Sequence, residues 1–80
     1  MTDLEILVAA SQAAHAFFDE VAAGGSTIED ADTAVFNAYH RIAPPMWWLC
    51  QSDQLLMFRY HFNVKLFALG LRPAAPTPAP

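Results

Sequence analysis

The sequence has 80 residues, a formal net charge of −4 and one cysteine, Cys50. This length predicts one domain, the single cysteine excludes an internal disulfide, and the acidic balance disfavours the basic face that nucleic-acid binding requires. Apolar residues make up 55% of the chain and charged residues 15%, whereas globular domains average about 45–50% and about 25%. Because a domain this small cannot bury so large an apolar share, we expect exposed apolar surface of the kind that marks interfaces.

The first predicted element is a helix over residues 3–23. Thr2 and Glu5 have capping-box spacing, the interior is rich in alanine, and Gly24-Gly25 suits the helix end. The polar strip is narrow, so we expect the helix to pack on two sides. The residues of the wider apolar face are Leu4, Leu7, Val8, Ala14, Phe18 and Val21, and those of the second face are Ile6, Ala13 and Phe17.

The second predicted element is a helix over residues 27–42. Ser26 and Glu29 repeat the capping-box spacing. Apolar residues recur at helical intervals, in the order Ile28, Ala31, Val35, Ala38 or Tyr39, and Ile42. Pro44-Pro45 ends the helix. Residues 1–39 hold seven acidic side chains and no lysine or arginine, and residues 40–80 hold all four basic ones, so the two halves are expected to attract each other.

The third predicted element is a helix over residues 46–69, with Ser52 as an alternative N-cap and Gly70 as the stop. Within it, residues 58–66 (FRYHFNVKL) alternate apolar and polar side chains, as a half-buried strand does. The spacing of Leu55, Phe58, Phe62, Leu66 and Leu69 fits a helix equally well, and the flanking Ser52 and Gly70 favour it. The alternative is an α+β chain with two N-terminal helices and a hairpin or a dimer-paired strand at 55–67.

The remaining segment, residues 73–80 (PAAPTPAP), is predicted to be a disordered or polyproline tail. Residues 1–72 are then a single all-α domain of three helices. Asp3 and Glu5 stand where a secretion signal would carry basic residues, and the uncharged run Ile6–Phe18 has 13 residues, too few to span a bilayer. We therefore expect a cytoplasmic protein.

No arrangement of side chains indicates catalysis. Cys50 lies among apolar residues, which favours packing over reactivity. His15 and Asp19 are four residues apart and are interpreted as a surface pair. No Glu-x-x-His repeat, phosphate-binding glycine loop or nucleophile motif occurs. We expect no catalytic residues, no metal and no cofactor, and hence a protein that is not an enzyme.

The aromatic residues supply the candidate interface. Adjacent tryptophans point in different directions on any regular element, so either one of Trp47 and Trp48 faces outward or both are needed in the core of so small a domain. Tryptophan is enriched at binding hot spots. The full candidate set is Trp47, Trp48, Phe58, Tyr60, Phe62, Phe36 and Tyr39.

These features favour a non-catalytic protein-binding module. It would be a small adaptor or inhibitor, of the bacterial or phage accessory kind, that acts on a larger protein and also pairs with itself as a helical homodimer. One alternative is a small hydrophobic-ligand binder with a pocket lined by Trp47, Trp48, Phe58 and Phe62. A second alternative, a peripheral membrane-interface protein, is disfavoured by the shortage of basic residues.

Overall fold

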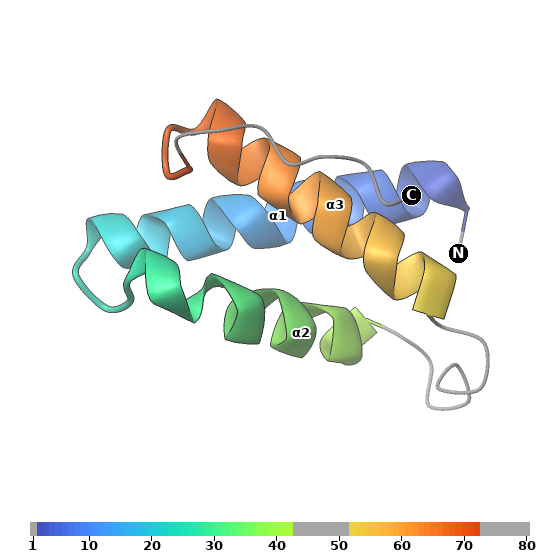
Figure 1. Ribbon diagram of the computed structural model, residues 1–80, viewed down its shortest axis with the longest axis horizontal. Coiled ribbons are helices and arrows are strands. Elements are labelled where there is room, and N and C mark those ends of the chain that lie inside the picture. The colour runs from blue at the N-terminus through green and yellow to red at the C-terminus, as the bar shows by residue number, and fades with distance from the viewer. Residues whose placement is uncertain (1, 43–51, 73–80) are drawn as a thin grey trace.

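The computed structural model describes residues 2–42 and 52–72 and shows an all-α chain over that range (Figure 1). Helix α1 spans Asp3–Ala22, a short 3-10 turn (η1) spans Ile28–Asp30, α2 spans Ala31–Ile42 and α3 spans Ser52–Ala68. The all-α prediction is confirmed, and the alternative with a strand at 55–67 is wrong because those residues are helical. Helix α3 has Ser52, the predicted alternative N-cap, as its first helical residue. The predicted start at residue 46 and the predicted tail at 73–80 lie outside the described residues.

Helix α1 begins and ends as its sequence predicts. The backbone N–H of Glu5 donates to Thr2 Oγ1 at 3.2 Å, and the N–H of Thr2 donates to Glu5 Oε1 at 2.9 Å, which is the capping box. At the other end Gly24 has φ +82°, where side chains are disfavoured. The N–H groups of Gly24 and Gly25 donate to the carbonyls of Val21 and Glu20, the Schellman pattern that satisfies the last carbonyls of a helix.

The helical segment begins at Ile28, one residue after the predicted start at 27, and α2 itself begins at Ala31. The expected pair of Ser26 and Glu29 does not form; instead the N–H of Thr27 donates to Asp30 Oδ2 at 3.0 Å. The Ser26 hydroxyl donates to Glu20 Oε2 at 3.2 Å, across the turn that follows α1. Ser26 is therefore held by the end of the preceding helix, and the first turn of the next helix is the 3-10 segment Ile28–Asp30.

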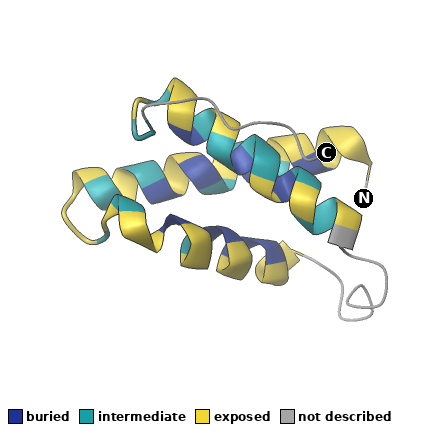
Figure 2. Cartoon of the chain, viewed as in Figure 1, coloured by how far each residue is buried: buried dark blue, intermediate teal, exposed yellow. Residues whose placement is uncertain are grey.

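The three helices share one apolar core. Helix α1 contacts both α2 and α3, α2 also contacts α3, and their dark-blue buried sides face one another in Figure 2. Rings from different helices meet there: the centroids of Phe17 and Phe62 are 6.1 Å apart, and those of Tyr39 and Phe58 are 5.5 Å apart. The buried apolar residues are Ile6, Ala10, Ala14, Phe17, Ala31, Val35, Ala38, Tyr39, Phe58, Phe62 and Leu66.

Of the two apolar faces predicted for α1, the structure buries the second more fully than the first. Leu4, Leu7 and Val8, expected on the wider packing face, are 66%, 38% and 46% exposed. The residues that α1 buries are Ile6, Ala10, Ala14 and Phe17. Two alanines on this side bring the α1 backbone close to its neighbours and leave room for the large rings of α3. Ile6 and Phe17 of the second predicted face and Ala14 of the first are therefore confirmed as packing residues, whereas Leu4, Leu7 and Val8 are not.

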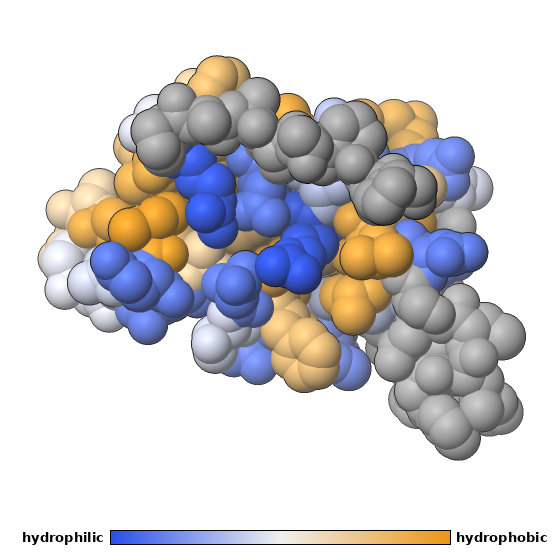
Figure 3. Space-filling view, viewed as in Figure 1, coloured by the Kyte–Doolittle hydropathy of each residue, from blue (hydrophilic) through white to orange (hydrophobic). Residues whose placement is uncertain are grey.

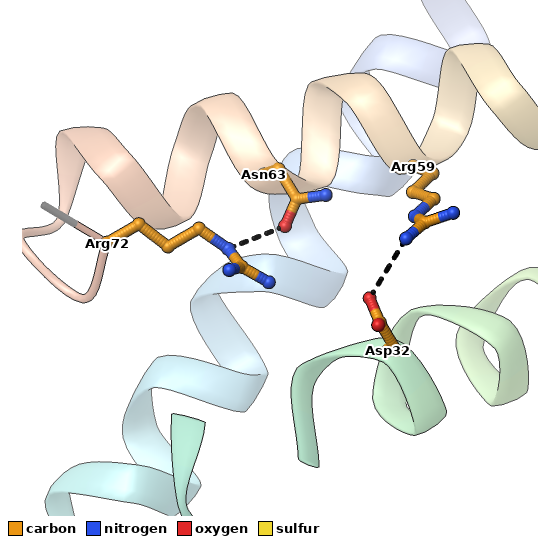
Figure 4. Close-up of polar contacts among 4 residues, drawn as sticks. All are labelled: Asp32, Arg59, Asn63 and Arg72. Atoms are coloured by element: carbon orange, nitrogen blue, oxygen red, sulfur yellow. Dashed lines mark hydrogen bonds and ion pairs between the residues drawn. The ribbon is translucent and has the colours of Figure 1, made fainter. Parts of the chain in front are cut away.

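Helices α2 and α3 are also joined by charge. Arg59 Nη2 on α3 lies 3.4 Å from Asp32 Oδ1 on α2 (Figure 4). A second polar contact, in which Arg72 Nε donates to Asn63 Oδ1 at 2.9 Å, joins the residues after α3 to α3 itself. The first contact is the attraction expected between the acidic N-terminal and basic C-terminal halves. Both of its side chains are more than half exposed, so the pair contributes only about 0.2–1 kcal/mol.

Candidate protein-binding surfaces

The alternation in residues 58–66 arises from two apolar stripes on opposite sides of α3. One helical residue turns the chain by about 100°, so residues two apart point about 200° apart. Phe58, Phe62 and Leu66, spaced by four, are buried at 1%, 1% and 0% exposure. Tyr60 and Val64, also spaced by four and offset by two, lie on the other side and remain in part exposed. The polar residues between them occupy the flanks of the helix. Read along the sequence, the two stripes together therefore give the alternation of apolar and polar residues that is typical of a strand.

We call the second side the outer stripe, defined by Leu56, Tyr60, Val64 and Phe67. Leu56 is 49%, Val64 36% and Phe67 42% exposed, and Tyr60 is half-buried. The outward side of a helix in a small domain is normally polar. Helix α3 instead presents apolar side chains both to the core and away from it.

A second surface, the α2–α3 groove, lies between the first turns of these two helices. It has a volume of about 410 Å³ and is lined by Asp32, Thr33, Val35, Phe36, Leu55, Leu56 and Arg59. Phe36 on one wall is 51% exposed and Leu56 on the other 49%. The Asp32–Arg59 pair crosses the groove (Figure 4). In Figure 3 hydrophobic patches over α2 and α3 border hydrophilic ones on this face, so the groove combines an apolar lining with a charged element.

The predicted interface residues divide between the core and the surface. Phe36 is exposed, with its ring centroid 4.3 Å from that of His40, and Tyr60 belongs to the outer stripe. Tyr39, Phe58 and Phe62 are at most 1% exposed. These three are corrected from interface to core, since their rings fill the space between the helices. Trp47 and Trp48 lie outside the described residues, so their role remains a prediction.

The sequence analysis missed the surface role of Leu56, Val64 and Phe67. The signal that could have found them is present: once the inner stripe is assigned, Tyr60 and Val64 must fall on the opposite side of the helix, and Leu56 and Phe67 follow from them at spacings of four and three. A third exposed apolar group, Leu4, Leu7 and Val8, lies on α1.

The polar groups of the described residues act mainly in the helix ends and on the surface. His15 Nδ1 lies 3.5 Å from Asp19 Oδ2, and both side chains are more than half exposed, as predicted for a surface pair. The backbone N–H of Thr2, followed by its side chain, lowers the pKa of the Glu5 carboxyl, an effect of the cap. Among the described residues no three His, Cys, Asp or Glu side chains gather into a possible metal site.

Two buried polar atoms of the described residues, Tyr39 Oη and Gln54 Oε1, have no hydrogen-bond partner there. Tyr39 is fully buried, and its hydroxyl has no hydrogen-bond partner within residues 2–42 and 52–72. Burial raises the pKa of this phenol above its ordinary value of 10.0.

Comparisons with protein-family models, with curated proteins and with solved structures give no match to this chain. In the part of the chain that the structure describes, no helix has the length and apolar character needed to cross a bilayer. The exposed apolar surfaces are therefore the features of this chain that bear on its function.

Proposed function

We propose that this protein is a non-catalytic protein-binding module, a small adaptor or inhibitor that engages a larger protein through the α2–α3 groove. The observation that carries the proposal is the groove itself, in which Phe36 and Leu56 stay half exposed on facing walls. Half-exposed phenylalanine and leucine gain free energy when a partner covers them, at about 25 cal/mol for each Å² of apolar area removed from water.

The chemistry of the groove fits an amphipathic helix of the partner. A groove whose two walls come from helices can accept apolar side chains at three- and four-residue spacing, as in other helix-in-groove complexes. Val35 and Leu55 line the groove with Phe36 and Leu56. The exposed carboxylate of Asp32 and guanidinium of Arg59 offer both signs of charge, which sets the orientation of a bound helix more than its affinity.

The test begins with affinity capture from the source cells, followed by titration with the purified captured protein. We expect Phe36→Ala to raise the Kd at least about tenfold, as the loss of an interface anchor does. Leu4→Ala, which removes an apolar side chain that is 66% exposed on α1, is the matched control and should leave the Kd within about twofold. Equal affinity of the wild-type chain and Phe36→Ala would contradict the proposal.

A small apolar ligand is the second candidate for the same groove, because its volume of about 410 Å³ falls within the range of about 300–1,000 Å³ found for ligand pockets. The lining differs from the one predicted, since Phe58 and Phe62 are core residues. A thermal-shift screen with apolar compounds separates the two functions. Stabilisation that disappears in Phe36→Ala supports the ligand, and no stabilisation by any compound supports the protein partner.

A further inference from the structure

We propose that the outer stripe of α3 binds a second copy of this chain, with the two α3 helices antiparallel about a two-fold axis that passes near residue 62. The inference goes beyond the proposed function because Tyr60, Val64 and Phe67 lie outside the lining of the α2–α3 groove, with which the stripe shares only Leu56. The stripe extends from Leu56 to Phe67, about 16 Å along the helix axis at 1.5 Å per residue, and so covers most of α3.

The order of side chains along the stripe is self-complementary in one antiparallel register. The midpoint of positions 56 and 67 is 61.5, and that of positions 60 and 64 is 62, so one axis serves both pairs. Leu56 then lies opposite the partner's Phe67, and Tyr60 opposite the partner's Val64. Each ring meets an aliphatic side chain, and two-fold symmetry repeats every contact, as an isologous interface requires.

The distribution of charge selects the same orientation. Between Leu56 and Phe67 the stripe carries no charged residue, and the charged or polar residues of this part of α3 lie on its flanks. Asp53 continues the stripe one turn before Leu56 and is exposed. Parallel helices would place two Asp53 carboxylates side by side, which is unfavourable. The antiparallel register separates them by about 26 Å along the axis.

These properties fit a second copy better than an unrelated protein. The stripe offers no charge with which a foreign surface could be oriented, whereas the α2–α3 groove offers Asp32 and Arg59. Each chain already buries the inner stripe of α3, so pairing requires no unfolding. One helix per chain covers less area than the about 1,200–2,000 Å² of a standard interface, and we therefore expect a weak dimer.

Sedimentation equilibrium of the full chain between about 10 and 500 µM tests the pairing, since mass action favours a weak dimer with rising concentration. The wild-type mass should rise from 8.8 kDa toward twice that value. The Val64→Ser/Phe67→Ser variant should dissociate at least about tenfold more readily. The matched control is Leu4→Ser/Val8→Ser, which removes two apolar side chains, 66% and 46% exposed, from α1; it should associate like the wild type.

Circular dichroism establishes that each variant is folded, and the single Val64→Ser change replaces the double variant if the latter is not. A wild-type chain that stays at 8.8 kDa at the highest concentration overturns the proposal. The proposal is also overturned if the Val64→Ser/Phe67→Ser variant associates as strongly as the control variant. Neither result bears on the groove, whose partner is tested by Phe36→Ala alone.

The orientation is tested with nitroxide labels on Asp53→Cys in a Cys50→Ser background, measured by pulsed electron resonance. The antiparallel pair places the two labels about 25 Å or more apart, and a parallel pair would place them at about the 8–10 Å that separates packed helix axes. A short distance overturns the antiparallel arrangement.

Discussion

Replacing Phe62 by alanine is expected to remove a large part of the stability of the chain, whereas the same change at Phe67 is expected to remove very little. Phe62 is 1% exposed, and its ring lies 6.1 Å from that of Phe17 in the core. Phe67 is 42% exposed on the outer stripe. The two residues are five positions apart in one helix, so the comparison isolates the side of α3 on which each ring lies.

The magnitude follows from burial. Removing a fully buried phenylalanine ring costs the transfer of its apolar area plus the cavity left behind, about 3–5 kcal/mol. The total stability of a chain of this length is about 4–12 kcal/mol, so Phe62→Ala should lower the Tm by about 12–40 °C. Phe67→Ala and Val64→Ala, both on the outer stripe, should each cost at most about 0.5 kcal/mol, because the better helix propensity of alanine offsets the lost contacts.

Urea unfolding followed by far-UV circular dichroism measures these values, at about 10 µM protein so that a weak dimer contributes little. If Phe62→Ala leaves too little folded chain to measure, Phe62→Leu should show a smaller loss of about 1–2 kcal/mol. A cost above about 2 kcal/mol for Val64→Ala at this dilution would refute the reasoning, since residues 62 and 64 share a face only in a strand.

Three further results are expected from unfolding experiments. Gly24→Ala should lower the free energy of unfolding by about 1 kcal/mol because Gly24 has φ +82°. Gly25→Ala should not lower it, since the new Cβ would meet only Glu20 O at 3.6 Å. Equal losses in the two variants would contradict the assignment of Gly24 as the helix cap. Glu5→Gln should flatten the acid side of the Tm–pH curve: hydrogen bonds from Thr2 hold the pKa of Glu5 below 4.5, so their stabilisation is complete above that pH and is lost as the pH falls through the lower folded value. If the Tm of Glu5→Gln falls with acid as steeply as that of the wild type, the hydrogen bonds from Thr2 do not stabilise the fold in this way. Tyr39→Phe should be neutral or stabilising by about 1 kcal/mol, since the hydroxyl lacks a partner among the described residues. It should also abolish a loss of stability above pH 10.0, where only the unfolded phenol ionises; a marked destabilisation would reveal a hydrogen bond to this hydroxyl.

Helix boundaries were largely predictable because their causes are local. The capping box of Thr2 and Glu5 and the glycine stops at Gly24 and Gly70 involve hydrogen bonds that span three to five residues. Such contacts can be identified from spacing alone. The one local error, at Ser26, arose because that hydroxyl is bonded to Glu20 of the preceding helix.

The candidate surfaces were less predictable because residue type does not show which side of a helix its neighbours cover. Phe58, Phe62 and Tyr39 looked as suitable for an interface as Phe36, and all are aromatic. Only Phe36 is exposed, since α2 turns Tyr39 toward α3 and leaves Phe36 beside the groove. Trp47 and Trp48 lie outside the described residues and remain candidates from the sequence.

The sequence by itself determined that the described chain forms helices, where they end, and that apolar residues exceed what one side of α3 can bury. Propensities, caps and residue counts are sums over near neighbours, and they need no knowledge of the fold. The tertiary structure alone decided that α1 packs through Ala10 and Ala14 and leaves Leu4 exposed. It also divided the alternating residues of α3 into a core stripe and an outer stripe. Both outcomes depend on how closely three helices approach, which is a property of their combined shape.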